Sequence, residues 1–139
     1  MPSATFDSNV YISALVFRKK ALALLDLAID RGVDIAISDE IMDETLRVLH
    51  EKFKWSDERL NEARTLIDSF ARHVTSTEKL DVVKADPNDN IIVECAAAAG
   101  SDYLVTGDHG ILGLGSYEKT QIITPAEFMD ILTGHGRSR

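Results

Sequence analysis

Short apolar segments with the pattern of β-strands alternate along this chain with longer segments of helical periodicity. The expected strands lie at residues 3–7, 33–38, 102–106 and 121–124, with a weak one at 73–77. Strands that alternate with helices in this way indicate a parallel sheet covered by helices on both faces. The sequence therefore predicts an α/β fold, a three-layer α/β/α sandwich with a central, mainly parallel sheet.

Residues suited to helix ends mark the boundaries of the expected helices. Ser38 is expected to cap a helix, with Asp39 and Glu40 in a first turn where the macrodipole favours acidic side chains. Pro125 is expected at the first position of the last helix, and Glu127 completes a capping box there. The expected helices cover residues 9–32 with a break at 18–20, 38–53, 56–70, 87–100 and 124 onward.

The length and cysteine count limit the kind of protein that this chain can form. Its 139 residues are expected to form one domain over residues 1–133, followed by a flexible tail at 134–139. Cys95 is the only cysteine, which excludes an intramolecular disulfide and favours a reducing compartment. No segment approaches the ~18 continuous apolar residues of a membrane span. We therefore expect a soluble, cytoplasmic protein with no membrane segment.

The charge balance is acidic, with 15 Lys and Arg against 23 Asp and Glu, a net charge of −8. This balance argues against nonspecific binding of nucleic acid through phosphate contacts alone. It leaves room for an enzyme acting on nucleic acid, because bound divalent cations reverse the sign of a pocket lined by carboxylates. Most of the negative charge is explained by solubility.

Two of the expected strands stop at an aspartate. Asp7 follows the first strand, and Asp108 follows the segment "YLVTG". The carboxyl ends of parallel strands meet at one edge of a sheet, where ligands bind near a topological switch point. We therefore expect these two carboxylates to lie together. Each also has a local explanation, as a helix cap at Asp7 and an Asx turn at Asp108.

Two further acids, Glu44 and Asp89, lie beside the apolar stripes of expected helices. Glu44 follows Ile41 by three residues, and Asp89 precedes Ile92 by three. A glutamate at the edge of a stripe can simply reach to solvent. Asp89 can likewise serve in the first turn of a helix whose N-cap is Asp86.

Considered together, the four acids are harder to explain by structure alone. Four carboxylates at one sheet edge would raise one another's pKa values and destabilise the fold. A hard divalent cation such as Mg²⁺ removes this objection, and two such ions can clamp the attacking and leaving oxygens of a phosphodiester. The polar residues that could orient the acids by hydrogen bonds are Asn9, Ser38 and Thr106.

The order and spacing of these residues resemble the PIN-domain family. The motifs are "DSN" at residues 7–9, Ser38 followed by Glu44, "DPNDNIIVECA" and "YLVTGD". They are most similar to the branch with the VapC-like toxins of bacterial and archaeal toxin–antitoxin pairs, over about residues 4–132. The resemblance implies a parallel-sheet α/β/α fold and a ribonuclease that depends on one or two Mg²⁺ or Mn²⁺ ions. The family's acidic positions fall on Asp7, Glu44, Asp89 and Asp108, with Asn9 and Thr106 in support and Asp86 as an accessory acid.

The resemblance also implies partners: an RNA substrate, a second copy in a homodimer and, for toxin-like members, a small antitoxin protein. One departure from the family's pattern is Gly107, where many relatives have a larger, often basic residue. This departure concerns substrate contacts near Asp108 rather than the chemistry. The basic residues that could contact RNA are Arg18, Lys19, Lys20, Arg47, Lys52 and Lys54, although a solvated charged face explains most of them.

Two other functions fit part of the pattern. An aspartyl-nucleophile phosphatase would need a second acid two residues after Asp7, where Asn9 stands. A catalytically weak binding module would act through a partner protein and would keep the acids only as relics. Retention of all four acids argues against such a module.

The remaining reactive side chains are expected to have structural roles. The four histidines do not have the spacing of zinc ligands. His109 is expected in a turn, Cys95 in the core, and Trp55 and Phe53 in packing at a helix end.

Overall fold

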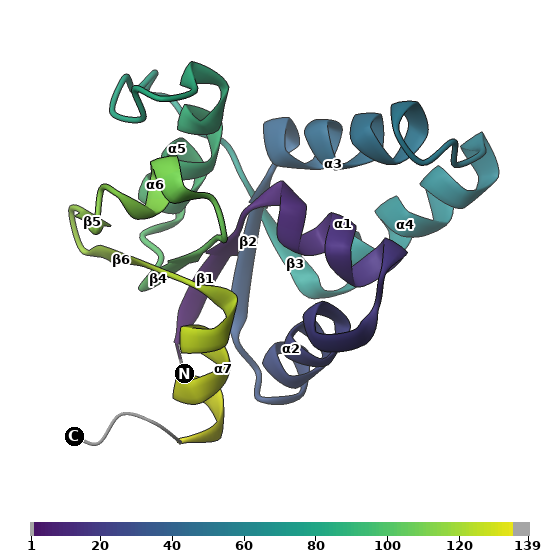
Figure 1. Ribbon diagram of the computed structural model, residues 1–139, viewed down its shortest axis with the longest axis horizontal. Helices are drawn as coiled ribbons and strands as arrows, with labels where there is room; N and C mark the ends of the chain where they lie inside the picture. The colour runs from purple at the N-terminus through teal and green to yellow at the C-terminus, as the bar shows by residue number, and fades with distance from the viewer. Residues whose placement is uncertain (1, 135–139) are drawn as a thin grey trace.

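A computed structural model of the chain describes residues 2–134 (Figure 1). The expected tail lies outside these residues, except for Gly134, which caps the last helix. The strands are β1 (Ser3–Phe6), β2 (Asp34–Ser38), β3 (Ala71–Val74), β4 (Tyr103–Val105), β5 (Ser116–Tyr117) and β6 (Thr120–Ile123).

Within residues 2–134, these strands form one sheet in the order β3-β2-β1-β4-β6-β5. Every neighbouring pair is parallel except β5 and β6. The chain moves from β1 outward through β2 to β3, and later places β4 against the other side of β1. The boundary between β1 and β4 is therefore a topological switch point, where a ligand crevice is expected beyond the carboxyl ends of the strands.

Side chains of β1 contact helices on both faces of the sheet. Thr5 Oγ1 lies 3.9 Å from the Sγ of Cys95 on α5 (Asn90–Ala99). The next residue, Phe6, packs against Phe128 of α7 (Pro125–Thr133), with ring centroids 5.9 Å apart. Because successive side chains of a strand point to opposite faces, α5 and α7 cover opposite faces. The predicted α/β/α sandwich is confirmed.

The other helices complete the layers (Figure 1). The helix α2 (Lys19–Asp30) contacts both α1 (Ser8–Val16) and α7, and α3 (Asp39–Glu51) contacts α1 and α4 (Asp57–Phe70). Within residues 2–134, no helix is long and apolar enough to cross a membrane.

The predicted break in the first helical region is confirmed between α1 and α2. Arg18 and Lys19 have φ angles of 65° and 40°. Few residues other than glycine adopt positive φ, so the chain changes direction here at some local conformational cost. The two helices then contact each other along their sides.

The structure corrects the sequence-based boundaries in three places. The strand expected at 73–77 is β3, at Ala71–Val74, and it follows α4 without an intervening turn. Its residues are exposed or half-buried, so they lack the alternating apolar pattern of a half-buried strand. Neither β5 nor the short helix α6 (His109–Leu112) was predicted, because both are too short to show a periodic pattern. The helix expected from Pro87 begins as the 3₁₀ turn η1 (Pro87–Asp89) and continues as α5.

Burial of Cys95 gives a direct test of the packing between α5 and the sheet. Cys95 is fully buried, and this burial raises the pKa of its thiol to about 11. Because the thiolate is the reactive form, we expect the native protein at mildly alkaline pH to react with Ellman's reagent about 100-fold more slowly than the unfolded protein, or slower still. The Cys95→Ser variant has no thiol and therefore measures the background of the assay. Rapid labelling of the native protein would show that α5 does not cover the sheet as described.

Candidate active site

Asp7 is the first residue after β1 and the N-cap of α1, and it is only 4% exposed. Asp7 Oδ2 accepts a hydrogen bond from Thr106 Oγ1 at 2.6 Å. Asp7 Oδ1 accepts longer hydrogen bonds from Ser8 Oγ and the Asn9 N–H, both at 3.3 Å. These donors offset the loss of hydration of a buried carboxylate. The local capping role predicted for Asp7 is confirmed, and the hydrogen bond from Thr106 adds a contact from a distant part of the chain.

Ser8 connects Asp7 to Glu44. Its one hydroxyl hydrogen is shared between the two acids, with the shorter contact to Glu44 Oε1 at 2.9 Å, which joins the start of α1 to the second turn of α3. Glu44 is half-buried, in agreement with its expected place beside the apolar stripe.

Thr106 connects Asp7 to Asp108. Its Oγ1 accepts a hydrogen bond from the Asp108 N–H at 3.0 Å while it donates to Asp7. Asp108 Oδ2 in turn accepts from the Ile111 N–H at 3.0 Å and caps α6. One hydrogen-bonded chain thus runs from Glu44 through Ser8, Asp7 and Thr106 to the backbone of Asp108.

Asp89 joins the group through electrostatics. Burial, together with the negative charges of Asp108, Asp86, Asp7 and Glu44, raises the pKa of Asp89 to about 7. Asp89 is followed directly by α5. The negative charges of Asp108, Asp86, Asp7 and Glu44 therefore lie close enough to Asp89 to act on its ionisation.

The other residues predicted to support the site make different contacts. Ser38 Oγ accepts from the Ile41 N–H and caps α3, as expected from the sequence. Asn9 is exposed and contributes its backbone N–H to Asp7. Asp86 Oδ1 accepts from the Asn88 N–H, in keeping with its predicted capping role. Within residues 2–134, Asn9 bonds to Asp7 through its backbone N–H, and the Asp86 carbonyl accepts a hydrogen bond from the Asp89 N–H at 2.9 Å, whereas Ser38 makes no hydrogen bond to the four acids.

Two residues that contribute to the site were not identified from the sequence. Ser8 was part of a recognised motif, but its bond to Glu44 spans 36 positions and leaves no local signal. Gly110 is the other, because a Cβ there would lie 3.1 Å from Asp108 Oδ2 and 3.2 Å from Ala85 Cβ. The sequence signal that could have identified Gly110 is its place in the short segment "GDHG", because glycine is typical of positions where the backbone approaches its neighbours closely.

Within residues 2–134, no side-chain nitrogen of a Lys, Arg or His lies within 4.0 Å of a carboxylate oxygen of Asp7, Glu44, Asp89 or Asp108. In the same part of the chain, no three Asp, Glu, His or Cys side chains are placed so that they could together hold a metal ion. The Asp108 carboxylate accepts the Ile111 N–H through Oδ2. The donor set is suited to a hard divalent ion because it consists of carboxylate oxygens.

Two of the six basic residues considered for RNA contact lie beside the acids. Lys20 lines a cavity that also includes Asn9 and Gly107, and Arg47 lines a hollow that includes Glu44. The residues Arg18, Lys19, Lys52 and Lys54 are exposed and line neither space.

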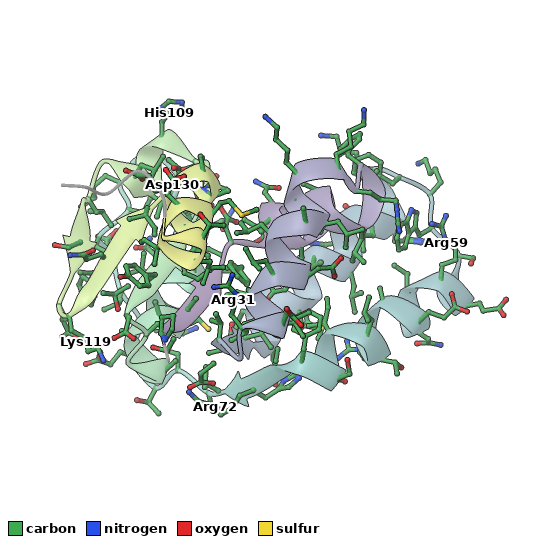
Figure 2. All side chains as sticks on the ribbon, turned by 90° about the horizontal axis from the view of Figure 1, so that it is seen from below. Arg31, Arg59, Arg72, His109, Lys119 and Asp130 are labelled. Carbon is green, nitrogen blue, oxygen red and sulfur yellow. The ribbon has the colours of Figure 1, made fainter. Side chains whose placement is uncertain are left out.

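His109 is the first residue of α6, and not part of a turn as predicted. Its side chain points away from the molecule (Figure 2). Trp55 is buried in a small apolar cluster at the end of α3, and Arg59 lies 3.9 Å from the centre of its ring. The predicted packing role of Trp55 is confirmed.

Comparison with known proteins agrees with this arrangement. A sequence model of the PIN domain matches residues 3–110. No curated protein sequence matches the chain.

Solved structures with the same fold include three with low sequence identity. VapBC2 from Rickettsia felis, bound to a DNA fragment from the promoter, contains a chain with 16% identity and a TM-score of 0.63, over 88% of this chain and 98% of that one. PAE2754 from Pyrobaculum aerophilum has 17% identity and a TM-score of 0.66, over 96% and 91% of the two chains. FitAB bound to the IR36 DNA fragment has 17% identity and a TM-score of 0.51, over 88% and 94%.

The chain belongs to the PIN-domain family, because the family's sequence model matches most of its length and its sheet has the family's architecture. PIN domains are generally nucleases and generally bind divalent metal ions.

The raised pKa of Asp89 predicts how the metal-free protein responds to pH. Folded Asp89 titrates near pH 7, whereas an unfolded aspartate titrates near pH 4. Between these values the folded state holds more protons than the unfolded state. In EDTA, Asp89 therefore contributes stability at about pH 4 that is lost as the pH rises through about 7.

Urea unfolding in EDTA at several pH values between about 5 and 8 measures this contribution. We expect the free energy of unfolding of Asp89→Asn to decline less with rising pH than that of the parent. The exposed Asp26 on α2 provides a matched control, and Asp26→Asn should follow the parent. Parallel pH profiles for Asp89→Asn and the parent would contradict the coupling of Asp89 to the other acids.

Proposed function

We propose that residues 1–133 form a metal-dependent endoribonuclease domain, in which Asp7, Glu44, Asp89 and Asp108 bind one or two Mg²⁺ or Mn²⁺ ions and direct hydrolysis of RNA phosphodiester bonds. The observation that carries the proposal is the group of four acids at the switch point. In residues 2–134, none of them forms an ion pair. Carboxylates gathered without a cation cost stability, and such a cost is typical of functional sites.

The chain's own residues orient the acids. A divalent ion, when bound, would polarise a phosphoryl oxygen and lower the pKa of a water molecule. Thr106 and Ser8 fix the Asp7 carboxylate from two sides, and Ser8 also fixes Glu44. Burial and neighbouring negative charges raise the pKa of Asp89 to about 7 in the metal-free protein, so Asp89 would release its proton when it binds a divalent ion near neutral pH.

We also propose that the protein is the toxin of a toxin–antitoxin pair, that it forms a homodimer and that it acts in the cytoplasm. The fold similarity to chains of VapBC2 and FitAB, both crystallised with DNA fragments, supports this assignment. Large apolar side chains are exposed at Phe17 and Leu66, by 60% and 47%. Exposed apolar residues of this kind are suited to contact with a second copy or an antitoxin.

A second candidate is a catalytically weak module that acts through a partner protein. One observation favours it, namely that in residues 2–134 no three acids are placed to hold a metal ion without rearrangement. RNA cleavage by the isolated protein that requires Mg²⁺ and stops on addition of EDTA would support the enzyme against the module.

Replacing Asp7 tests the proposed chemistry. Removing a residue that only supports a metal ligand lowers activity by roughly 10–100-fold. Asp7→Asn removes a proposed metal ligand itself, so we expect it to lower the rate of RNA cleavage by more than this. Folding should be retained, since the substitution reduces repulsion within the acidic group. Cleavage of a fluorescent single-stranded oligoribonucleotide in Mg²⁺, with circular dichroism for folding, measures both.

The matched control is Asp30→Asn. Asp30 is exposed and ends α2, close in sequence to the start of β2 and thus at the opposite edge of the sheet. This variant should cleave at the parent's rate. If purified Asp7→Asn cut RNA as fast as the parent, the proposed role of Asp7 would be wrong.

Replacing Thr106 tests the orientation of Asp7. Thr106→Val keeps the shape of the side chain but removes the hydroxyl that donates to Asp7 Oδ2 at 2.6 Å. We expect it to weaken Mg²⁺ affinity or activity by about 10–100-fold. Thr106→Ser restores the hydroxyl and should recover most of the loss. Equal activities of the valine and serine variants would show that this hydrogen bond does not matter to function.

A further inference from the structure

A cavity of about 690 Å³ lies between α1, α2, α7 and the loop that follows β4, and we refer to it as the α1–α2–α7 pocket. Its lining includes Asn9, Lys20, Leu24, Gly107, Met129 and Asp130. Figure 2 labels Asp130 on α7. A cavity of several hundred Å³ has the size of a small-molecule site.

The pocket shares a wall with the acidic group. The backbone N–H of Asn9 donates to Asp7 Oδ1 at 3.3 Å. Gly107 stands between Thr106, which donates to Asp7, and Asp108. A nucleotide whose phosphate lies at the acids would therefore have the pocket directly beside it.

Gly107 leaves this side of the site open. No heavy atom lies within 4 Å of a Cβ built on Gly107, and its φ is not in the left-handed region. Neither backbone conformation nor lack of space therefore requires glycine here. The absence of a side chain at Gly107 therefore mainly affects what can enter the pocket. Gly107 is also the position at which the sequence departs from the family's pattern.

The chemistry of the lining is suited to a nucleobase. Ala126 and Met129 provide apolar contact, and a methionine sulfur also contacts aromatic rings favourably. Asn9 is exposed, and its side-chain amide makes no hydrogen bond within residues 2–134. Its donor and acceptor groups are thus available to the edge of a base, and the Lys20 ammonium is available to a neighbouring phosphate.

The hollow on the Glu44 side is less suited to a nucleotide. It is lined by Glu40, Asp43 and Glu44 against one cation, Arg47. Glu40 and Asp43, which are not among the four acids, repel a phosphate there, whereas the charged residues that line the α1–α2–α7 pocket are one cation, Lys20, and one anion, Asp130. The charges therefore favour the α1–α2–α7 pocket as the place where substrate is held.

We propose that the α1–α2–α7 pocket binds the base of the nucleotide next to the scissile phosphate of a single-stranded RNA. This inference rests on the proposed ribonuclease function and extends it, because it assigns a base-binding subsite and makes Gly107 a determinant of substrate binding.

Neutral nucleosides test the subsite without metal and without repulsion by the acids. The probes are adenosine, guanosine, cytidine and uridine, titrated one at a time in EDTA into the ¹⁵N-labelled protein. We expect at least one of them to shift the amide signals of Lys20, Gly107 and Met129, with an affinity of about millimolar, as befits a small fragment. Ribose alone should leave these signals unchanged.

Two glycine variants make the test specific. Gly107→Met places a side chain at the pocket and should weaken nucleoside binding at least about tenfold. Gly113→Met is the matched control, because Gly113 is exposed, lies outside the pocket lining and has 3.4 Å between an added Cβ and the nearest atom. It should bind nucleosides as the parent does.

Three results would overturn the proposal: no shift at the pocket with any nucleoside, equal binding by Gly107→Met and the parent, or shifts produced only by an apolar peptide. The last result would assign the pocket to a protein partner. The nucleoside-binding test can succeed or fail independently of the RNA-cleavage test of the proposed function. Nucleoside binding without RNA cleavage would sustain the subsite and reject the nuclease, whereas cleavage without nucleoside binding would do the reverse.

Discussion

A hydrogen bond of 2.6 Å from Thr106 to Asp7 joins the ends of β1 and β4, the two central strands on either side of the topological switch point. The Thr106 backbone N–H also bonds to the Ile123 carbonyl at 3.0 Å, which ties the same residue to β6. The position of the buried Asp7 carboxylate is therefore set by the sheet itself. Glu44 is then placed relative to Asp7 through Ser8, and Asp108 through the hydroxyl of Thr106.

This arrangement gathers negative charge at the switch point, where none of the four acids forms an ion pair within the described part of the chain. The raised pKa of Asp89 is the measurable consequence, and its causes are burial and the neighbouring carboxylates. A divalent ion bound by these acids would compensate their negative charge and would supply a Lewis acid for phosphodiester hydrolysis. Beside the acids, the lining of the α1–α2–α7 pocket is mainly apolar. The two features together suit a ligand with a phosphate at one end and an aromatic base at the other.

The layers, the parallel strands and the helix caps could be predicted because periodicity and capping are local properties of sequence. Asp7 and Asp108 were identified because strand ends can be read from apolar runs, and parallel strands share an edge. The bond between Ser8 and Glu44 could not be predicted, since it depends on how α1 and α3 pack. Ser38 was expected beside the acids, but the structure shows it bonded to the Ile41 N–H. The pairing of β3 with β2 depends on tertiary contacts that its half-exposed residues do not encode.

The central claim is that the acids at the switch point form a cation site. A crystal structure of the protein soaked in Mn²⁺, with anomalous data, tests it most directly. We predict an anomalous peak coordinated by the carboxylate of Asp7 and at least one of Glu44, Asp89 and Asp108. Saturating Mn²⁺ that leaves the switch point without a peak, or binds only at surface carboxylates elsewhere, would contradict the claim.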